Sequence, residues 1–364
     1  MTPDIRTPPE EDRAQVVELL RASLNFTRAW AADRGASMPL ESHRSVYEGD
    51  RIVATAAVLQ ILREARDDGM SISALYPAVL RPYRRLGYEL GGSFCEHRLD
   101  LNAIPSDLGG DLPSVELLDV ERDLEGLKAC YRDWSRHGNG PLEPTEDRWW
   151  TQRILQPFGE AISRAVVVRG QDDAIEGFAV FRYVSAEGGH LDIDFGLECL
   201  ALATTTDRAT RALFTYFRSF RGVGLWVQWC GSSEDPVAML IPEQSIDTPF
   251  RFRWMTRLLD VRAALVGRGY PPIDAEAIVA VSDPEFPDND GPWRLTVHDG
   301  EAMVEPAGSD SDRLIPIGIL SAMFTGSLRV PDAVRLGYID RDDPTAGTLE
   351  RLFAGADPWC PFFF

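Results

Sequence analysis

The same three predicted elements follow one another twice along this chain: a hairpin, an amphipathic helix and a short buried strand. The first set comprises a hairpin at 45–54 with a Glu-Gly-Asp turn, a helix at 56–68 and a strand at 72–75. The second set comprises a hairpin at 165–183, a helix capped at Thr206 and a strand at 225–229. This repetition predicts two α/β units related by a diverged duplication.

The residues after about 250 follow a different pattern. Apolar side chains recur from Trp254 to Tyr270 and predict a helix that ends at Gly269. Strands at 277–281 and 293–297 and helices near 317–324 and 348–353 complete an α+β module. The clusters of Gly and Pro between these patterns predict three domains, which comprise residues 1–112, 113–249 and 250–364.

Charge restricts the partners of the chain. Its 364 residues include 37 basic and 57 acidic ones, which gives a net charge of −20. A negative surface repels phosphate backbones and anionic lipids, so we expect no nucleic-acid or membrane partner and favour a small cationic ligand. Apolar runs are too short to span a bilayer, and the first residues lack the pattern of a signal peptide, so we predict a cytoplasmic protein.

Metal-ligating residues are few and scattered. The five cysteines and five histidines form no C-x-x-C or H-E-x-x-H pattern, so we predict neither a disulfide framework nor a metal site. The tryptophans are interpreted as core or interface residues rather than as a ligand cage. The residues in that interpretation are Trp149, Trp150, Trp226 and Trp229.

A family resemblance rests on the run Ala74-Leu75-Tyr76-Pro77 and on Tyr83-Arg84-Arg85-Leu86-Gly87-Tyr88, which resemble a segment of the Eis (enhanced intracellular survival) acetyltransferases. It extends to Leu-Trp-Val at 225–227, to the pattern at 257–270 and to the aromatic carboxy terminus, and so covers essentially the whole chain. The resemblance implies a GNAT domain, a central GNAT-like domain and a domain like sterol carrier protein. It also implies acetyl transfer from acetyl-CoA to an amine and a homo-oligomer, with a hexamer as the family's form.

The same resemblance implies roles for two residues. Tyr83 matches the general acid that reprotonates the coenzyme A thiolate, since a phenol carries its proton at neutral pH. The terminal carboxylate of Phe364 matches the general base, and flanking phenylalanines would raise its pKa by desolvation. The alternatives are a packed aromatic for Tyr83 and a docked hydrophobic tail for Phe364. Phe363 stands where some relatives have an acidic residue.

One departure from the family concerns the coenzyme. Family members place two strands and a Val-x-Val-x-Pro-x-x-Arg-Arg-x-Gly turn between the hairpin and the helix, and backbone N–H groups of that turn bind pyrophosphate. Here residues 51–56 lead directly into the helix, without an arginine-glycine turn. The sequence therefore predicts weak or no binding of acetyl-CoA.

Three functional hypotheses follow. The first is an Eis-like N-acetyltransferase that uses Tyr83 and the terminal carboxylate of Phe364. The second is a pseudoenzyme or repurposed member that binds or converts another small molecule, such as an amine-bearing one, without acetyl-CoA. The third is a binding module in which the domain like sterol carrier protein holds a hydrophobic molecule.

Overall fold

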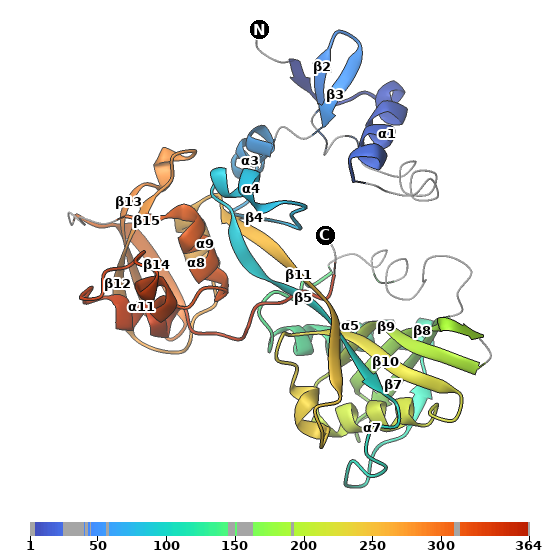
Figure 1. Cartoon of the computed structure of the whole chain (residues 1–364). Helices are drawn as coiled ribbons and strands as arrows, with labels where there is room; N and C mark the ends of the chain where they lie inside the picture. The colour runs from blue at the N-terminus through green and yellow to red at the C-terminus, as the bar shows by residue number, and fades with distance from the viewer. Residues whose placement is uncertain are drawn as a thin grey trace. The chain divides into compact units, whose positions relative to one another are not determined.

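The computed structural model of the chain describes residues 4–24, 40, 43, 45–55, 58–144, 150, 163–190, 193–308 and 314–362 (Figure 1). The chain forms two compact units. The first contains the residues up to Ser73 together with Leu259–Ala264, and the second contains Ala74–Leu258 and Leu265–Phe364.

The first unit contains a small antiparallel sheet in the order β1-β2-β3. Its elements are β1 (Asp4–Arg6), the 3-10 turn Glu10–Asp12, α1 (Arg13–Leu24), β2 (Ser45–Glu48), β3 (Arg51–Thr55) and α3 (Val58–Asp67). Val16 of α1 packs on Tyr47 and Ile52 of the hairpin. The predicted hairpin and helix are thus confirmed, and only residues 56 and 57 separate β3 from α3.

An eight-stranded sheet dominates the second unit, in the order β4-β11-β5-β10-β9-β8-β7-β6. Its strands are β4 (Ile72–Leu75), β5 (Glu89–Asp100), β6 (Val115–Leu117), β7 (Ser163–Arg169), β8 (Ile175–His190), β9 (Ile193–Thr204), β10 (Gly224–Gly231) and β11 (Ile246–Leu258). The helices between these strands are α4 (Leu80–Arg85), α5 (Val120–Ser135), α7 (Asp207–Arg218) and the 3-10 helix Pro236–Leu240. Strands are thus present between about 115 and 245 as predicted, but they form one sheet with β4, β5 and β11 rather than a second sheet of their own.

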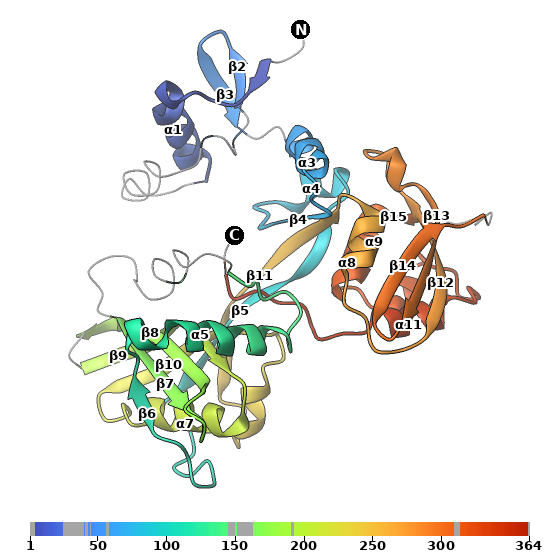
Figure 2. The same ribbon diagram turned by 180° about the vertical axis from the view of Figure 1, so that it is seen from behind.

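The helices α5 and α7 cover opposite faces of this sheet (Figure 2). Successive side chains of a strand point to opposite faces, so Val166 and Val168 of β7 pack with Leu213 of α7. Val167 packs instead with Leu127 of α5. Thr206 caps α7 by accepting a hydrogen bond from the backbone N–H of Ala209 at 3.2 Å, as the sequence predicted.

Trp150 belongs to the core rather than to an exposed aromatic surface. Its side chain is 1% exposed and meets Tyr131 edge to face, with ring centroids 5.2 Å apart. Phe178 contacts it from the sheet at 6.5 Å. The residues on either side of it, 145–149 and 151–162, lie outside the described residues.

The helix predicted from Trp254 to Tyr270 is wrong in its first half. Trp254 lies on β11, which pairs with β5 in antiparallel register, and the helix α8 comprises only Val261–Gly267. Aromatic and basic residues alternate before Trp254, a period of two that is typical of a strand. Gly92 of β5 stands opposite Trp254 and leaves room for its indole.

The carboxy-terminal part of the second unit is a separate four-stranded sheet in the order β14-β13-β12-β15. Its strands are β12 (Ala275–Ser282), β13 (Gly291–His298), β14 (Glu301–Pro306) and β15 (Ile315–Pro316), with a 3-10 turn at Pro287–Asn289. The helices that pack with it are α9 (Ile317–Thr325), α10 (Val330–Arg335) and α11 (Ala346–Leu352). The predicted strands and helices of the α+β module are confirmed here.

A buried ion pair joins β11 to this second sheet. Nη2 of Arg257 lies 2.8 Å from Oδ1 of Asp283, and both side chains are fully buried. Asp283 also accepts hydrogen bonds from the backbone N–H of Phe286 and from the side-chain amide of Asn289. The carboxylate is therefore saturated with donors.

Candidate functional site

Tyr83 lies on α4 and is partly exposed. Its ring meets Tyr88 edge to face, with centroids 6.0 Å apart. The contact with Tyr88 agrees with the interpretation of Tyr83 as a packed aromatic residue. The partial exposure of its side chain is compatible with the interpretation as a general acid. The catalytic role of Tyr83 stays a prediction.

Phe364 lies outside the described residues, as does Phe363, so the predicted carboxylate base stays untested. The residues just before them are held firmly. Trp359 donates its backbone N–H to the carbonyl of Asn139 at 2.9 Å, and Cys360 donates to the carbonyl of Ser93 at 3.0 Å. The hydroxyl of Tyr76 donates to the carbonyl of Phe362 at 3.0 Å. We call residues 357–362 the C-terminal segment.

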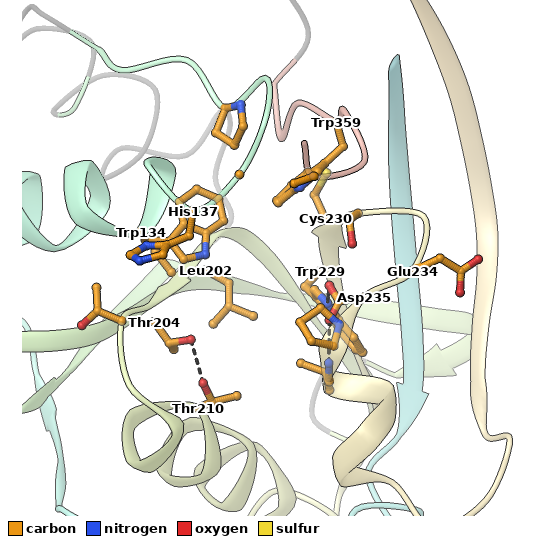
Figure 3. A pocket seen from close by; sticks show the side chains of 18 of the residues that line it. Trp134, His137, Leu202, Thr204, Thr210, Trp229, Cys230, Glu234, Asp235 and Trp359 are labelled. Atoms are coloured by element: carbon orange, nitrogen blue, oxygen red, sulfur yellow. Dashed lines mark hydrogen bonds between the residues drawn. The ribbon is translucent and has the colours of Figure 1, made fainter. Parts of the chain in front are cut away.

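The C-terminal segment forms one wall of a cavity of about 690 Å³ (Figure 3). Its other walls come from the end of α5, from the β9–α7 connection and from the end of β10 with the loop that follows. Its lining includes Trp134, His137, Leu202, Thr204–Asp207, Thr210, Phe214, Trp229, Cys230, Glu234, Asp235, Asp357 and Trp359. Segments from three separate regions of the sequence thus enclose one space.

The cavity lies between the ends of two parallel strands, β9 and β10. The pairing of β10 with β9 runs from Gly224–Phe195 to Gln228–Glu198. Both strands continue beyond that pair, β9 to Thr204 and β10 to Gly231. Residues of these continuations line the cavity from two sides, so the cavity lies where the strands part. Crevices beyond the carboxyl ends of parallel strands are common ligand sites in α/β sheets.

The hydroxyl groups beside α7 are paired with protein atoms. Oγ1 of Thr204 lies 2.7 Å from Oγ1 of Thr210, as the dashed line in Figure 3 marks. Thr205 donates both its backbone N–H and its hydroxyl to the carbonyl of Glu176. Thr206 donates to the carboxylate of the same residue at 3.0 Å. This wall therefore has few donors left for a ligand.

Carboxylates determine the charge of the cavity. Four acidic residues line it, and among the described lining residues none is Lys or Arg. Asp235 accepts the indole N–H of Trp229 at 3.0 Å, whereas Glu234 points away from the other labelled side chains (Figure 3). Asp207 pairs with Arg211 at 3.7 Å. The site is accordingly acidic, with aromatic walls.

Thiolate chemistry does not fit this site. Burial raises the pKa of Cys230 well above its usual range, and burial raises the pKa of Cys360 to about 11. Both thiols therefore stay protonated at neutral pH. Within the described residues, no group of three His, Cys, Asp or Glu side chains is arranged to hold a metal ion.

The starts of α7 and α3 both lack features that favour a bound pyrophosphate. At α7, Thr206 already occupies the N–H of Ala209, and Asp207 places a negative charge in the first turn. At α3, residues 52–62 contain neither a glycine nor an arginine. An anion site at a helix start needs free backbone N–H groups and gains from a nearby cation, and Arg211 near the start of α7 is already paired with Asp207 at 3.7 Å.

Comparison with known proteins identifies two consecutive domains between residues 144 and 361. Residues 144–262 match the family model of the acetyltransferase (GNAT) domain, and residues 261–361 match that of the sterol carrier protein domain. The chain therefore contains a GNAT domain that is followed by a sterol carrier protein domain. This is the Eis-like architecture that the sequence resemblance implied.

Relatives match along nearly the whole chain. An uncharacterized N-acetyltransferase of Streptomyces avermitilis is 23% identical, over 93% of this chain and 84% of its own. A GCN5-related N-acetyltransferase of Anabaena variabilis shares the fold with a TM-score of 0.88 at 21% identity, over 100% of both chains. Eis1 of Mycobacterium abscessus shares it with a TM-score of 0.76 at 18% identity, also over 100% of both chains.

The cavity was not anticipated from the sequence. Trp229, interpreted as a core residue, does pack against Phe214, but it also lines the cavity. The aromatic chain end was noted, yet no pattern linked Trp359 to Trp134. In the part of the chain that the structure describes, no helix combines the length and apolarity that a bilayer crossing requires.

Proposed function

We propose that this chain is an Eis-like member of the GNAT N-acetyltransferases that recognises a small amine and holds acetyl-CoA only weakly. The observation that carries this proposal is the direct step from β3 to α3, with two residues between them. A strand-turn-helix element that could present N–H groups to pyrophosphate has no room there. The match to the GNAT domain supports the class, and the acidic cavity supports an amine rather than an anion as the ligand.

Acetyl-CoA titration by calorimetry tests this function. Charge-assisted hydrogen bonds contribute about 1.5–3 kcal/mol each, so losing three or four weakens affinity by several powers of ten. We expect no saturation up to about 1 mM acetyl-CoA. Tyr83→Phe should then change acetyl transfer as little as the matched variant Tyr338→Phe, because there is little activity to lose.

A second candidate is a fully active acetyltransferase, which the partial exposure of Tyr83 within its motif favours. Tyr83 would be the acid and the terminal carboxylate of Phe364 the base, as the resemblance implies. A micromolar dissociation constant for acetyl-CoA, with turnover that collapses in Tyr83→Phe but not in Tyr338→Phe, would establish this candidate and refute the first.

The quaternary state and the cellular location are part of the same proposal. We expect a homo-oligomer, with the hexamer as the form that the resemblance implies, in the cytoplasm. Exposed apolar side chains such as Leu117 and Met239, which are 69% and 88% exposed, support an interface. Sedimentation velocity at micromolar concentration should give a mass several times that of one chain, and a single species of 40.5 kDa would contradict the expectation.

A further inference from the structure

The cavity where β9 and β10 part has the size of a small-molecule site. Its volume of about 690 Å³ falls within the range that encloses drug-sized ligands. All of the described residues that line it belong to the second unit. The charge and the aromatic rings of these walls determine which ligand the cavity favours.

Charge excludes anions from this site. Its four carboxylates are Asp207, Glu234, Asp235 and Asp357, and among the described lining residues none is Lys or Arg, with His137 the single imidazole. The chain's net charge of −20 adds to the same field. Since the N–H of Ala209 and the threonine hydroxyls are already engaged, the α7 side offers little to a phosphate or carboxylate.

Aromatic rings provide the apolar walls. Trp134 and Trp359 meet edge to face with centroids 5.6 Å apart, and Trp229 lines the same cavity. Indole is the side chain that binds cations best through its π face. The N–H of Trp229 donates to Asp235, and this hydrogen bond makes the indole ring richer in electrons and hence a better partner for a cation.

We propose that this cavity binds a small organic cation, an alkylated ammonium group on a flat apolar body, between the tryptophans and the carboxylates. Alkylated ammonium fits because it needs no hydrogen-bond acceptor and carries its charge on methyl groups that pack against indole. The inference goes beyond the proposed function, since a quaternary ammonium has no N–H to acetylate. Binding can therefore be measured apart from acetyl transfer.

Calorimetry on the full chain with benzyltrimethylammonium tests the proposal. We expect one cation per chain, with affinity that falls as salt concentration rises. The neutral isostere neopentylbenzene, in which carbon replaces nitrogen, should bind at least about fivefold more weakly. The anion phenylacetate should not bind. Equal affinity for the three compounds, or tighter binding of phenylacetate, would overturn the proposal.

Two variants, each with a matched control, test whether the cation binds in this cavity. Trp359→Leu should weaken binding about fivefold or more, whereas Trp226→Leu, outside the lining, should not. Asp357→Asn should weaken it about three- to tenfold, whereas Asp342→Asn should not. Because Asp357 is exposed, its variant tests the site even if Trp359→Leu fails to fold. Unchanged affinity in Asp357→Asn and in folded Trp359→Leu would refute the site.

The experiments can refute the proposed function and the proposed cation site independently of each other. Absence of acetyl-CoA binding together with cation binding supports both. Micromolar acetyl-CoA binding with an unchanged cation titration refutes only the weak-coenzyme function. Loss of selectivity for the cation refutes only the inference about the cavity.

Discussion

Replacing Asp283 by alanine lowers the free energy of unfolding of the second unit by about 3–5 kcal/mol, the cost of leaving one buried charge unpaired. Arg257 has no exposed surface and would retain its charge without the carboxylate that faces it. The backbone N–H of Phe286 and the side chain of Asn289 would lose their acceptor as well. Urea denaturation followed by tryptophan fluorescence measures the change.

An exposed ion pair is the matched control. Arg294 and Glu276 lie 2.6 Å apart on β13 and β12, and both are about half exposed. Glu276→Ala should cost no more than about 1 kcal/mol. The double variant Arg257→Met with Asp283→Leu should recover much of the stability lost in Asp283→Ala, because it removes both charges. Equal losses in Asp283→Ala and Glu276→Ala would contradict the argument.

Replacing Gly92 by alanine should destabilise the second unit and loosen the C-terminal segment. A Cβ atom at Gly92 would overlap the indole of Trp254 and stand 2.6 Å from the carbonyl oxygen of Pro358. Overpacking of this kind costs about 1–3 kcal/mol, and here part of the strain falls on backbone that cannot turn away. Gly222→Ala is the control, since nothing lies within 4 Å of its added carbon.

Denaturation and carboxypeptidase digestion measure the two effects at Gly92. We expect faster removal of the C-terminal segment in Gly92→Ala than in the parent chain or in Gly222→Ala. Cation binding in the cavity should weaken in parallel, because the same segment carries Trp359 and Asp357. A Gly92→Ala protein with parental stability and parental digestion rate would show that the packing around Trp254 adapts without cost.

Short sequence motifs predicted those elements that are stabilised by contacts between residues close together in the chain. The hairpin turn at Gly49 has a φ of 64°, a conformation that glycine adopts without strain. The cap at Thr206 forms a hydrogen bond three residues along the chain. Such contacts depend on neighbouring residues alone, and both were found from spacing.

Long-range pairing accounts for what the sequence did not reveal. The strand β5 was missed because residues 90–95 are apolar or small without a clear period, and Trp254 was placed on a helix because residues 254–259 are mostly apolar around Arg257. Each becomes a strand by pairing with the other. The cavity has the same cause, since Trp134, Trp229 and Trp359 meet only when the whole sheet has formed. Neither Tyr83 nor Phe364 lies in its described lining.

The position of the C-terminal segment bears on the order in which a newly made chain can fold. Strand β5 pairs with β10 and with β11, and Ser93 within it finally pairs with Trp359. During synthesis β5 is therefore exposed on one edge until β11 leaves the ribosome, and the backbone of Ser93 lacks its bonds to Pro358 and Cys360 until those residues are made. Unpaired edges promote aggregation, so we expect nascent chains that stop before residue 357 to depend on chaperones and the full chain to escape that dependence.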